Sequence, residues 1–170
     1  FWRYLRSLSI IQSASLLRLQ APLRARVWAL CGYAPKSVTV NIDTTVNTVY
    51  GKIEGARKGH NPKHRCKKGL RPVLCLLAAT REYLCGSQRR GETIRAKEVA
   101  RQIRKFRRLL PACVKHIRVR GDGEIIGWEG VKACLDEGFT YTFGNKRCAP
   151  PFPDDGWYRH RDYEYNECMY

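Results

Sequence analysis

Hydrophobic and polar residues alternate along two short stretches of the chain. In residues 37–46, β-branched side chains alternate with polar ones, and in residues 116–120 isoleucine and valine alternate with histidine and arginine. A period of two with β-branched residues predicts a strand in each stretch. Asp43 lies near the end of the first strand, and Asp122 follows the second.

A spacing of three to four residues marks the predicted helices. Residues 9–30 carry apolar side chains at helical spacing, and Pro22 fits the first turn of a second helix there. A further helix is expected from Asp122 to residue 137, with apolar residues three and four apart at Trp128, Val131 and Leu135. Residues 93–110 form the clearest helix, whose apolar stripe contains Ile94, Val99, Ile103, Phe106 and Leu110.

Shorter elements fill the remainder. Residues 48–53, 81–88 and 139–143 are expected as short strands, and the apolar run 72–80 as a strand buried on both faces. Glycine-, proline- and charge-rich residues predict loops at 55–69 and 144–156, and residues 157–170 have a strand-like alternation. The order of strands, helix, strand, helix and strand predicts an α/β layer with a central mixed sheet. We expect an N-terminal helical segment (1–35), a core (36–145) and a following segment (146–170).

The composition points to a polyanionic partner. The chain has 170 residues, a length typical of one domain, and its 32 Lys and Arg against 15 Asp and Glu give a formal charge of +17. Nucleic acid is the default partner for such an excess of positive charge, and an anionic membrane surface is the competitor. Basic residues interrupt every apolar run, so neither a membrane span nor a signal peptide is expected. Because the first residue is Phe1, we expect a fragment of a longer protein.

The eight cysteines indicate no disulfide framework. Their spacing is irregular, and Cys75 and Cys134 lie in apolar runs, where cysteine is typically a small buried hydrophobe. Without a secretory signal, we expect a reducing cytoplasm.

The two aspartates are candidate metal ligands. A carboxylate at a strand end is a natural ligand for Mg²⁺, which prefers hard oxygen donors. From the residues alone, Asp43 on the polar face of a strand is also explained as a solvated strand-end residue, and Asp122 between two glycines as a plain turn. Metal-binding carboxylates in a strongly basic protein favour chemistry on a nucleic-acid backbone.

Two basic segments are candidate contacts to the DNA backbone. Zinc is an alternative in the first segment through His60, His64 and Cys66, but no fourth ligand is obvious. A solvated surface is the alternative for the second, the polar face of the helix at 93–110. The aromatic residues of 157–165 favour core packing over stacking on bases. The candidate DNA-binding residues are Lys58, His60, Lys63, Arg65, Lys67 and Lys68 in the first segment and Arg104 and Arg108 in the second.

Several of these motifs resemble one known family. Residues 41–46 (Asn-Ile-Asp-Thr-Thr-Val), 50–51 (Tyr-Gly) and 54–62 (Glu-Gly-Ala-Arg-Lys-Gly-His-Asn-Pro) resemble the region of the first catalytic aspartate in DDE transposases of bacterial insertion sequences. Residues 71–82 and 90–93 look like the next two strands of that family and its turn into a helix. Residues 119–123 (Val-Arg-Gly-Asp-Gly) look like its second catalytic aspartate. The resemblance covers residues 36–145.

This resemblance implies a ribonuclease H-like fold and a catalytic Asp-Asp-Glu set that binds two Mg²⁺ or Mn²⁺ ions. In that scheme Asp43 bridges the metals and Asp122 holds one of them, for an in-line phosphoryl displacement. The implied partners are double-stranded DNA, as element ends and target, and further copies of the chain.

The third acid departs from the family pattern. The family carries it in a helical Tyr-x-x-Arg-x-x-x-Glu signature. Tyr158 and Arg161 have that spacing, but Tyr165 stands at the glutamate position and Glu164 misses it by one. One residue on a helix rotates a side chain by about 100°. We therefore expect the third acid beyond Tyr170, and an inactive or weakly active chain.

The leading hypothesis is thus a fragment of a transposase that cleaves and joins DNA strands. The alternative is a non-catalytic, basic DNA-binding remnant of a transposase. A basic protein of the membrane surface or the ribosome is a third, weaker reading, which no motif supports.

Overall fold

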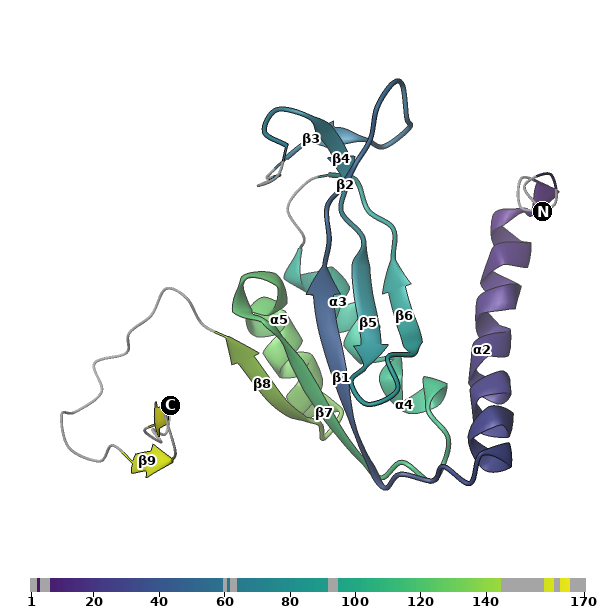
Figure 1. The fold of residues 1–170 in the computed structure, drawn as a ribbon, viewed down its shortest axis with the longest axis vertical. Helices are drawn as coiled ribbons and strands as arrows, with labels where there is room; N and C mark the ends of the chain where they lie inside the picture. Colours follow the sequence, from purple (N-terminus) through teal and green to yellow (C-terminus); the bar gives the residue numbers. More distant parts are fainter. Residues whose placement is uncertain are drawn as a thin grey trace.

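The centre of the molecule is a five-stranded mixed sheet in the order β6-β5-β1-β7-β8 (Figure 1). The computed structural model describes residues 3, 7–59, 61, 64–91, 95–144, 158–160 and 163–165. β5 runs antiparallel to β1 and β6, whereas β7 runs parallel to β1 and β8. The strands of the sheet are β1 (Ser37–Thr44), β5 (Val73–Leu77), β6 (Tyr83–Ser87), β7 (His116–Asp122) and β8 (Thr140–Gly144).

Helices cover one face of this sheet. Figure 1 shows α3 (Ala96–Ile103) and α5 (Gly123–Asp136) behind β1 and β7, with the short α4 (Phe106–Leu109) near the start of β1. The core lies between the two layers and includes Val40, Val119, Ile103 and Phe106, all of them 0% exposed. The mixed sheet flanked by helices, predicted from the sequence, is confirmed.

The helix predicted over residues 93–110 is broken. α3 ends at Ile103 and α4 begins at Phe106, with a turn at Arg104 and Lys105. The predicted apolar stripe is buried where the structure describes it, at Val99, Ile103, Phe106 and Leu110. Ile94 lies outside the described residues. The break changes the direction of the apolar stripe but not the residues that form it.

The predicted stripe of α5 is wrong. Trp128 is 70% and Leu135 58% exposed, while Ala133 and Cys134 are buried. α5 packs against α3 through small residues, and a Cβ added at Gly127 would lie 2.8 Å from the Cβ of Ala96. Close helix packing selects small side chains, so the large apolar residues of α5 lie on its other side.

Strand β5 also differs from its prediction. Its inward residues Val73, Cys75 and Leu77 are buried, whereas Leu74 and Leu76 are only partly buried. The apolar run is therefore a strand with one fully covered face, not one buried on both faces.

A single helix, α2 (Ile10–Leu30), replaces the two helices expected before β1. Ser9 and Gln12 form a capping box at its start. Pro22 lies inside the helix on its exposed side. Proline has no N–H, so the carbonyl one turn earlier lacks its usual donor, and on this side water can donate to it instead. α2 stands beside β6 and is anchored by the buried Arg24, whose guanidinium donates to Glu82 and to the carbonyls of Tyr83 and Leu109.

The predicted basic loop contains a second sheet. β2 (Asn47–Thr48), β3 (Arg57–Lys58) and β4 (Lys68–Leu70) form a three-stranded sheet in the order β2-β4-β3. The prediction of a loop over 55–69 and of one partner strand over 48–53 is therefore wrong. Short strands rich in Lys and Arg lack the apolar alternation on which strand prediction depends. We call residues 47–70 the small basic sheet.

Two further short strands form a hairpin near the C-terminus. β9 (Tyr158–His160) pairs antiparallel with β10 (Tyr163–Tyr165), and Tyr158 lies opposite Tyr165. The alternation of residues 157–170 suggests one strand that continues to the end of the chain, whereas the described residues form two short paired strands. Within the described residues, no helix is both long and apolar enough to cross a membrane.

Candidate metal and nucleic-acid site

The parallel pairing of β1 with β7 brings the two aspartates together. The paired positions run in step from Ser37 opposite His116 to Ile42 opposite Gly121. The next residue on each strand is an aspartate, so Asp43 and Asp122 end neighbouring strands at the same level. Neighbouring strands lie about 4.8 Å apart.

Both aspartates project from the face of the sheet opposite the core. Val40 and Val119 pair with each other and are fully buried, so the residues alternating with them belong to the other face. On that face Arg120 donates from Nε to Oδ1 of Asn41 at 3.0 Å. Asp43 and Asp122 follow two residues further along the same two strands and share this face.

The carboxylates are open to ligands to different degrees. Asp43 is exposed, and its Oδ1 accepts a hydrogen bond from the Thr44 amide at 2.7 Å, which fixes its orientation. Asp122 is partly buried at the junction of β7 and α5. Mg²⁺ typically binds one or two carboxylates and completes its shell with waters and substrate phosphates. The two carboxylates fit that donor set. No group of three or more His, Cys, Asp or Glu residues gathers for a metal within the described part of the chain.

Two arginines that the sequence reasoning did not select lie on the same face. Arg118 and Arg120 are exposed on β7, four and two residues before Asp122. The alternation of β7 was recognised from the sequence, but the shared face with Asp122 follows only from the register. Cations beside a pair of carboxylates reduce their mutual repulsion and attract phosphate.

The small basic sheet lies beyond the end of β1 where Asp43 is located (Figure 1). The buried Asn61 stabilises it, since its Nδ2 donates to Thr48 Oγ1 at 2.9 Å and its Oδ1 accepts from the His64 amide at 3.0 Å. The chain therefore presents a basic surface next to the aspartates. Its exposed basic side chains include the predicted Lys58, Arg65, Lys67 and Lys68 together with Arg57.

His60 and Lys63, also predicted to bind DNA, lie outside the described residues. His64 and Cys66, from the alternative zinc reading, are both exposed. The zinc reading stays an untested alternative.

Arg104 and Arg108 lie away from the aspartates. Arg104 caps α3 and forms an ion pair with Asp136 at 3.5 Å. Arg108 belongs to α4, which is tied to the start of β7 because Arg107 donates to the carbonyls of Val114 and Lys115. Both arginines are therefore about one strand length, roughly 20 Å, from Asp43. Their DNA-binding role stays a prediction, and it would require a second contact region.

Comparison with known proteins gives structural neighbours only. No family model matches the sequence, and no curated protein matches it. Among solved structures, the chain is similar to a piggyBac transposase in a synaptic complex with hairpin DNA, with a TM-score of 0.47 and 16% identity over 80% of this chain. It is also similar to the Mos1 transposase in a paired-end complex with the left transposon end, with a TM-score of 0.40 and 10% identity over 74% of this chain. The chain spans 31% and 40% of these two proteins.

Proposed function

We propose that this chain is the part of a DDE transposase core that carries the first two catalytic aspartates. In this proposal it takes part in metal-dependent cleavage and strand transfer of double-stranded DNA. The observation that supports the proposal is the register of β1 and β7, in which Asp43, next to the last residue of β1, and Asp122, the last residue of β7, follow directly on the pair Ile42–Gly121. The motif resemblance around Asp43 and Asp122 supports the same assignment. The bacterial insertion-sequence origin is part of the proposal and rests on the motifs alone.

Each group has a distinct task in the proposed site. Asp43 and Asp122 would hold Mg²⁺ or Mn²⁺. When bound, the ions lower the pKa of an attacking water or hydroxyl group and stabilise the charge on the leaving oxygen. Arg118 and Arg120, on the same face, position the scissile phosphate, and the small basic sheet holds the adjoining DNA backbone.

The third acid has no assignment among the described residues. Tyr158 and Tyr165, which belong to the partial signature, are paired backbone positions of the antiparallel strands β9 and β10 and do not lie on one helix. We propose that the third acid lies beyond Tyr170. This predicts weak metal binding and little cleavage by the present chain alone.

Metal binding tests the proposal without requiring activity. Mn²⁺ binding to the full chain, measured by electron paramagnetic resonance, is expected to weaken at least tenfold in Asp43→Asn and in Asp122→Asn. Asp136→Asn is the matched control, because it removes a carboxylate of α5 that pairs with Arg104. Equal Mn²⁺ affinity in all four proteins would refute the assignment of the two aspartates.

A basic DNA-binding protein without catalysis is the second candidate. The formal charge of +17 and the exposed small basic sheet support it independently of the aspartates. The two candidates differ in one measurement, a gel-shift salt series with and without Mg²⁺. If the chain is a non-catalytic DNA-binding protein, Asp43→Asn leaves DNA binding unchanged with and without Mg²⁺.

A further inference from the structure

Two cysteines face each other on neighbouring strands at the edge of the sheet, on the face opposite the aspartates. Cys75 of β5 and Cys85 of β6 are directly opposed in an antiparallel pair. Such residues have Cα atoms about 4.5 to 5.5 Å apart, within the range of about 4.4 to 6.8 Å that a disulfide bridges. Both are free thiols in this structure.

A β-bulge directs Cys85 toward the helix side of the sheet. Cys75 pairs with Cys85 while the next residue, Leu76, pairs with Tyr83, so Leu84 is an extra residue in β6. Bulges occur frequently where a side chain has to be re-aimed. Cys75 is fully buried, but Cys85 is only partly buried.

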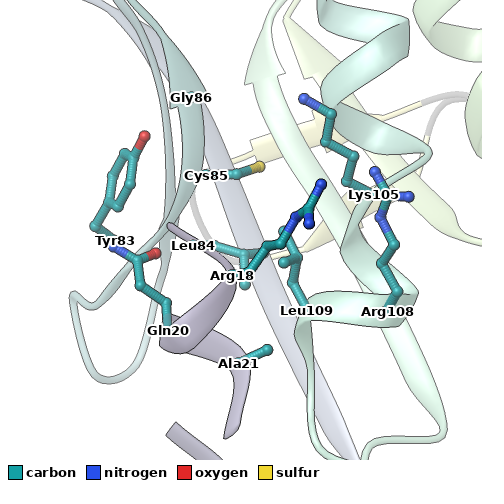
Figure 2. Close-up of a pocket in the computed structure, with 10 residues that line it drawn as sticks. All are labelled: Arg18, Gln20, Ala21, Tyr83, Leu84, Cys85, Gly86, Lys105, Arg108 and Leu109. Atoms are coloured by element: carbon teal, nitrogen blue, oxygen red, sulfur yellow. The ribbon is translucent and has the colours of Figure 1, made fainter. Parts of the chain in front are cut away.

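Cys85 opens into a cavity of about 610 Å³ between β6, α2 and α4. Figure 2 shows its sulfur on the α4 side of the strand, with Arg18, Lys105 and Arg108 projecting into the same space. The lining, within the described part of the chain, includes no acidic residue. A small neutral or anionic molecule therefore has access to the thiol in a positively charged environment.

This environment favours the thiolate of Cys85. The hydrogen bond with the Cys75 thiol lowers the pKa of Cys85, and the positive charges of Lys105, Arg24 and Arg108 lower it further, against the opposing effect of burial. The partner behaves in the opposite way, because the hydrogen bond with Cys85 and burial raise the pKa of Cys75. Tyr83, the remaining titratable neighbour, has a pKa raised by burial and stays neutral. Oxidation-sensitive cysteines share these features: thiolate character, access and a neighbouring thiol.

We propose that Cys85 is a site of oxidation by hydrogen peroxide and that Cys75 is its resolving partner. The Cys85 thiolate attacks the peroxide, an S–O bond forms, the O–O bond breaks, and the leaving oxygen departs as water after protonation. The Cys75 sulfur then attacks the resulting sulfenic acid. An S–S bond forms, the S–O bond breaks, and the oxygen leaves as a second water with the proton of Cys75. Sulfur is oxidised by two electrons in total and the peroxide is reduced.

This site is independent of the proposed transposase chemistry. Cys75 and Cys85 lie on the covered face of the sheet, whereas Asp43 and Asp122 project from the other face, and neither cysteine is assigned to metal or DNA. The site shares one residue with the DNA-binding prediction, Arg108, which lines the cavity. If Cys85 and Cys75 do not react with peroxide, the metal proposal is unaffected, and a failed metal proposal leaves the cysteine proposal unaffected.

Peptide mapping tests the proposal on the reduced full chain treated with hydrogen peroxide under native conditions. Trypsin is expected to release residues 69–81, which contain Cys75, and residues 82–89, which contain Cys85. The expected product is these two peptides joined and lighter by two hydrogens. Cys75→Ser is expected to accumulate a sulfenic acid at Cys85 that dimedone traps, and Cys85→Ser to abolish the joined product.

The cavity cations provide a second test. Lys105→Met is expected to slow the oxidation of Cys85 about threefold, whereas Lys97→Met, an exposed lysine of α3, leaves the rate unchanged. In wild type, the pH midpoint for alkylation of Cys85 is expected to lie below that of a free cysteine, about 8.5. This measurement needs no variant and holds even if a substitution prevents folding. Oxidation at Cys31 or Cys66 without the joined peptides, or an alkylation midpoint at Cys85 above about 8.5, would overturn the proposal.

Discussion

The two faces of the central sheet are formed by the same strands but have opposite chemistry. Val40 and Val119 are fully buried under α3 and α5, while their neighbours Asn41 and Arg120 meet on the other face and lead to the two aspartates. The covered face determines the fold, because its alternation sets which residues are buried. The open face is then free to carry the charged residues, positioned by a register that the hydrophobic face specifies. We expect substitutions on the two faces to separate stability from ligand binding.

Phe106→Ala is the strongest test of the covered face. Phe106 is fully buried and stacks on Phe139 with ring centroids 6.4 Å apart. Removing the ring leaves a cavity in the packed core, which is expected to lower the free energy of unfolding by about 3 to 5 kcal/mol. Urea denaturation measures this loss. Arg118→Ala on the open face is expected to change the same quantity by less than about 0.5 kcal/mol, and similar losses in both variants would refute the distinction between the faces.

Gly127→Ala tests how closely α5 approaches α3. Gly127 has φ +55° and interrupts the helical backbone of α5, and an added Cβ would meet the Cβ of Ala96 at 2.8 Å. We expect a loss of about 2 to 3 kcal/mol, from backbone strain and overpacking together. Gly138→Ala is the matched control, since its φ is +67° but nothing lies within 4 Å of an added Cβ. Thermal unfolding compares the two variants. The larger loss expected at Gly127 combines the contact with Ala96 and a backbone at φ +55°, ψ −178°, a region nearly restricted to glycine, and equal melting temperatures would show that α5 tolerates both.

Glu82 connects α2 to the edge of the sheet and makes this contact sensitive to pH. Partial burial would raise the pKa of Glu82, but hydrogen bonds from Trp28 and Arg24 outweigh it and hold the pKa below its ordinary value. A lowered folded-state pKa contributes stability above the unfolded-state value, about 4.3, that is lost as the pH falls through the folded-state value. We therefore expect the stability advantage of wild type over Glu82→Gln to be constant from pH 6 to 7 and to shrink below about pH 5. Urea midpoints across this range measure it, and an advantage that grows on acidification would contradict the assignment.

The sequence identified the sheet and the aspartates because both depend on local patterns. The alternation around Val40 and Val119 predicts buried strands, and Asp43 and Asp122 stand at their ends. The small basic sheet was missed because Arg57, Lys58 and Lys68 pair through backbone groups without an apolar face. The buried face of α5 was also missed, since the closeness of α3 that excludes Trp128 is a tertiary effect. The opposition of Cys75 and Cys85 depends on a bulge at Leu84, which no local pattern predicts.

The arginines of the open face give the smallest effect on stability and the most specific one on binding. Arg118 and Arg120 are exposed beside Asp122, so each alanine variant is expected to unfold like wild type. If each arginine neutralises one phosphate, its removal lowers the slope of log affinity against log salt concentration by about one. Fluorescence anisotropy with a DNA duplex across a salt series measures this slope. Arg26→Ala, an exposed arginine on α2, is the control and should leave the slope unchanged. Equal slopes for Arg26→Ala and Arg120→Ala would mean that DNA does not approach the open face. The arginines proposed to position the phosphate would then not act together with the aspartates.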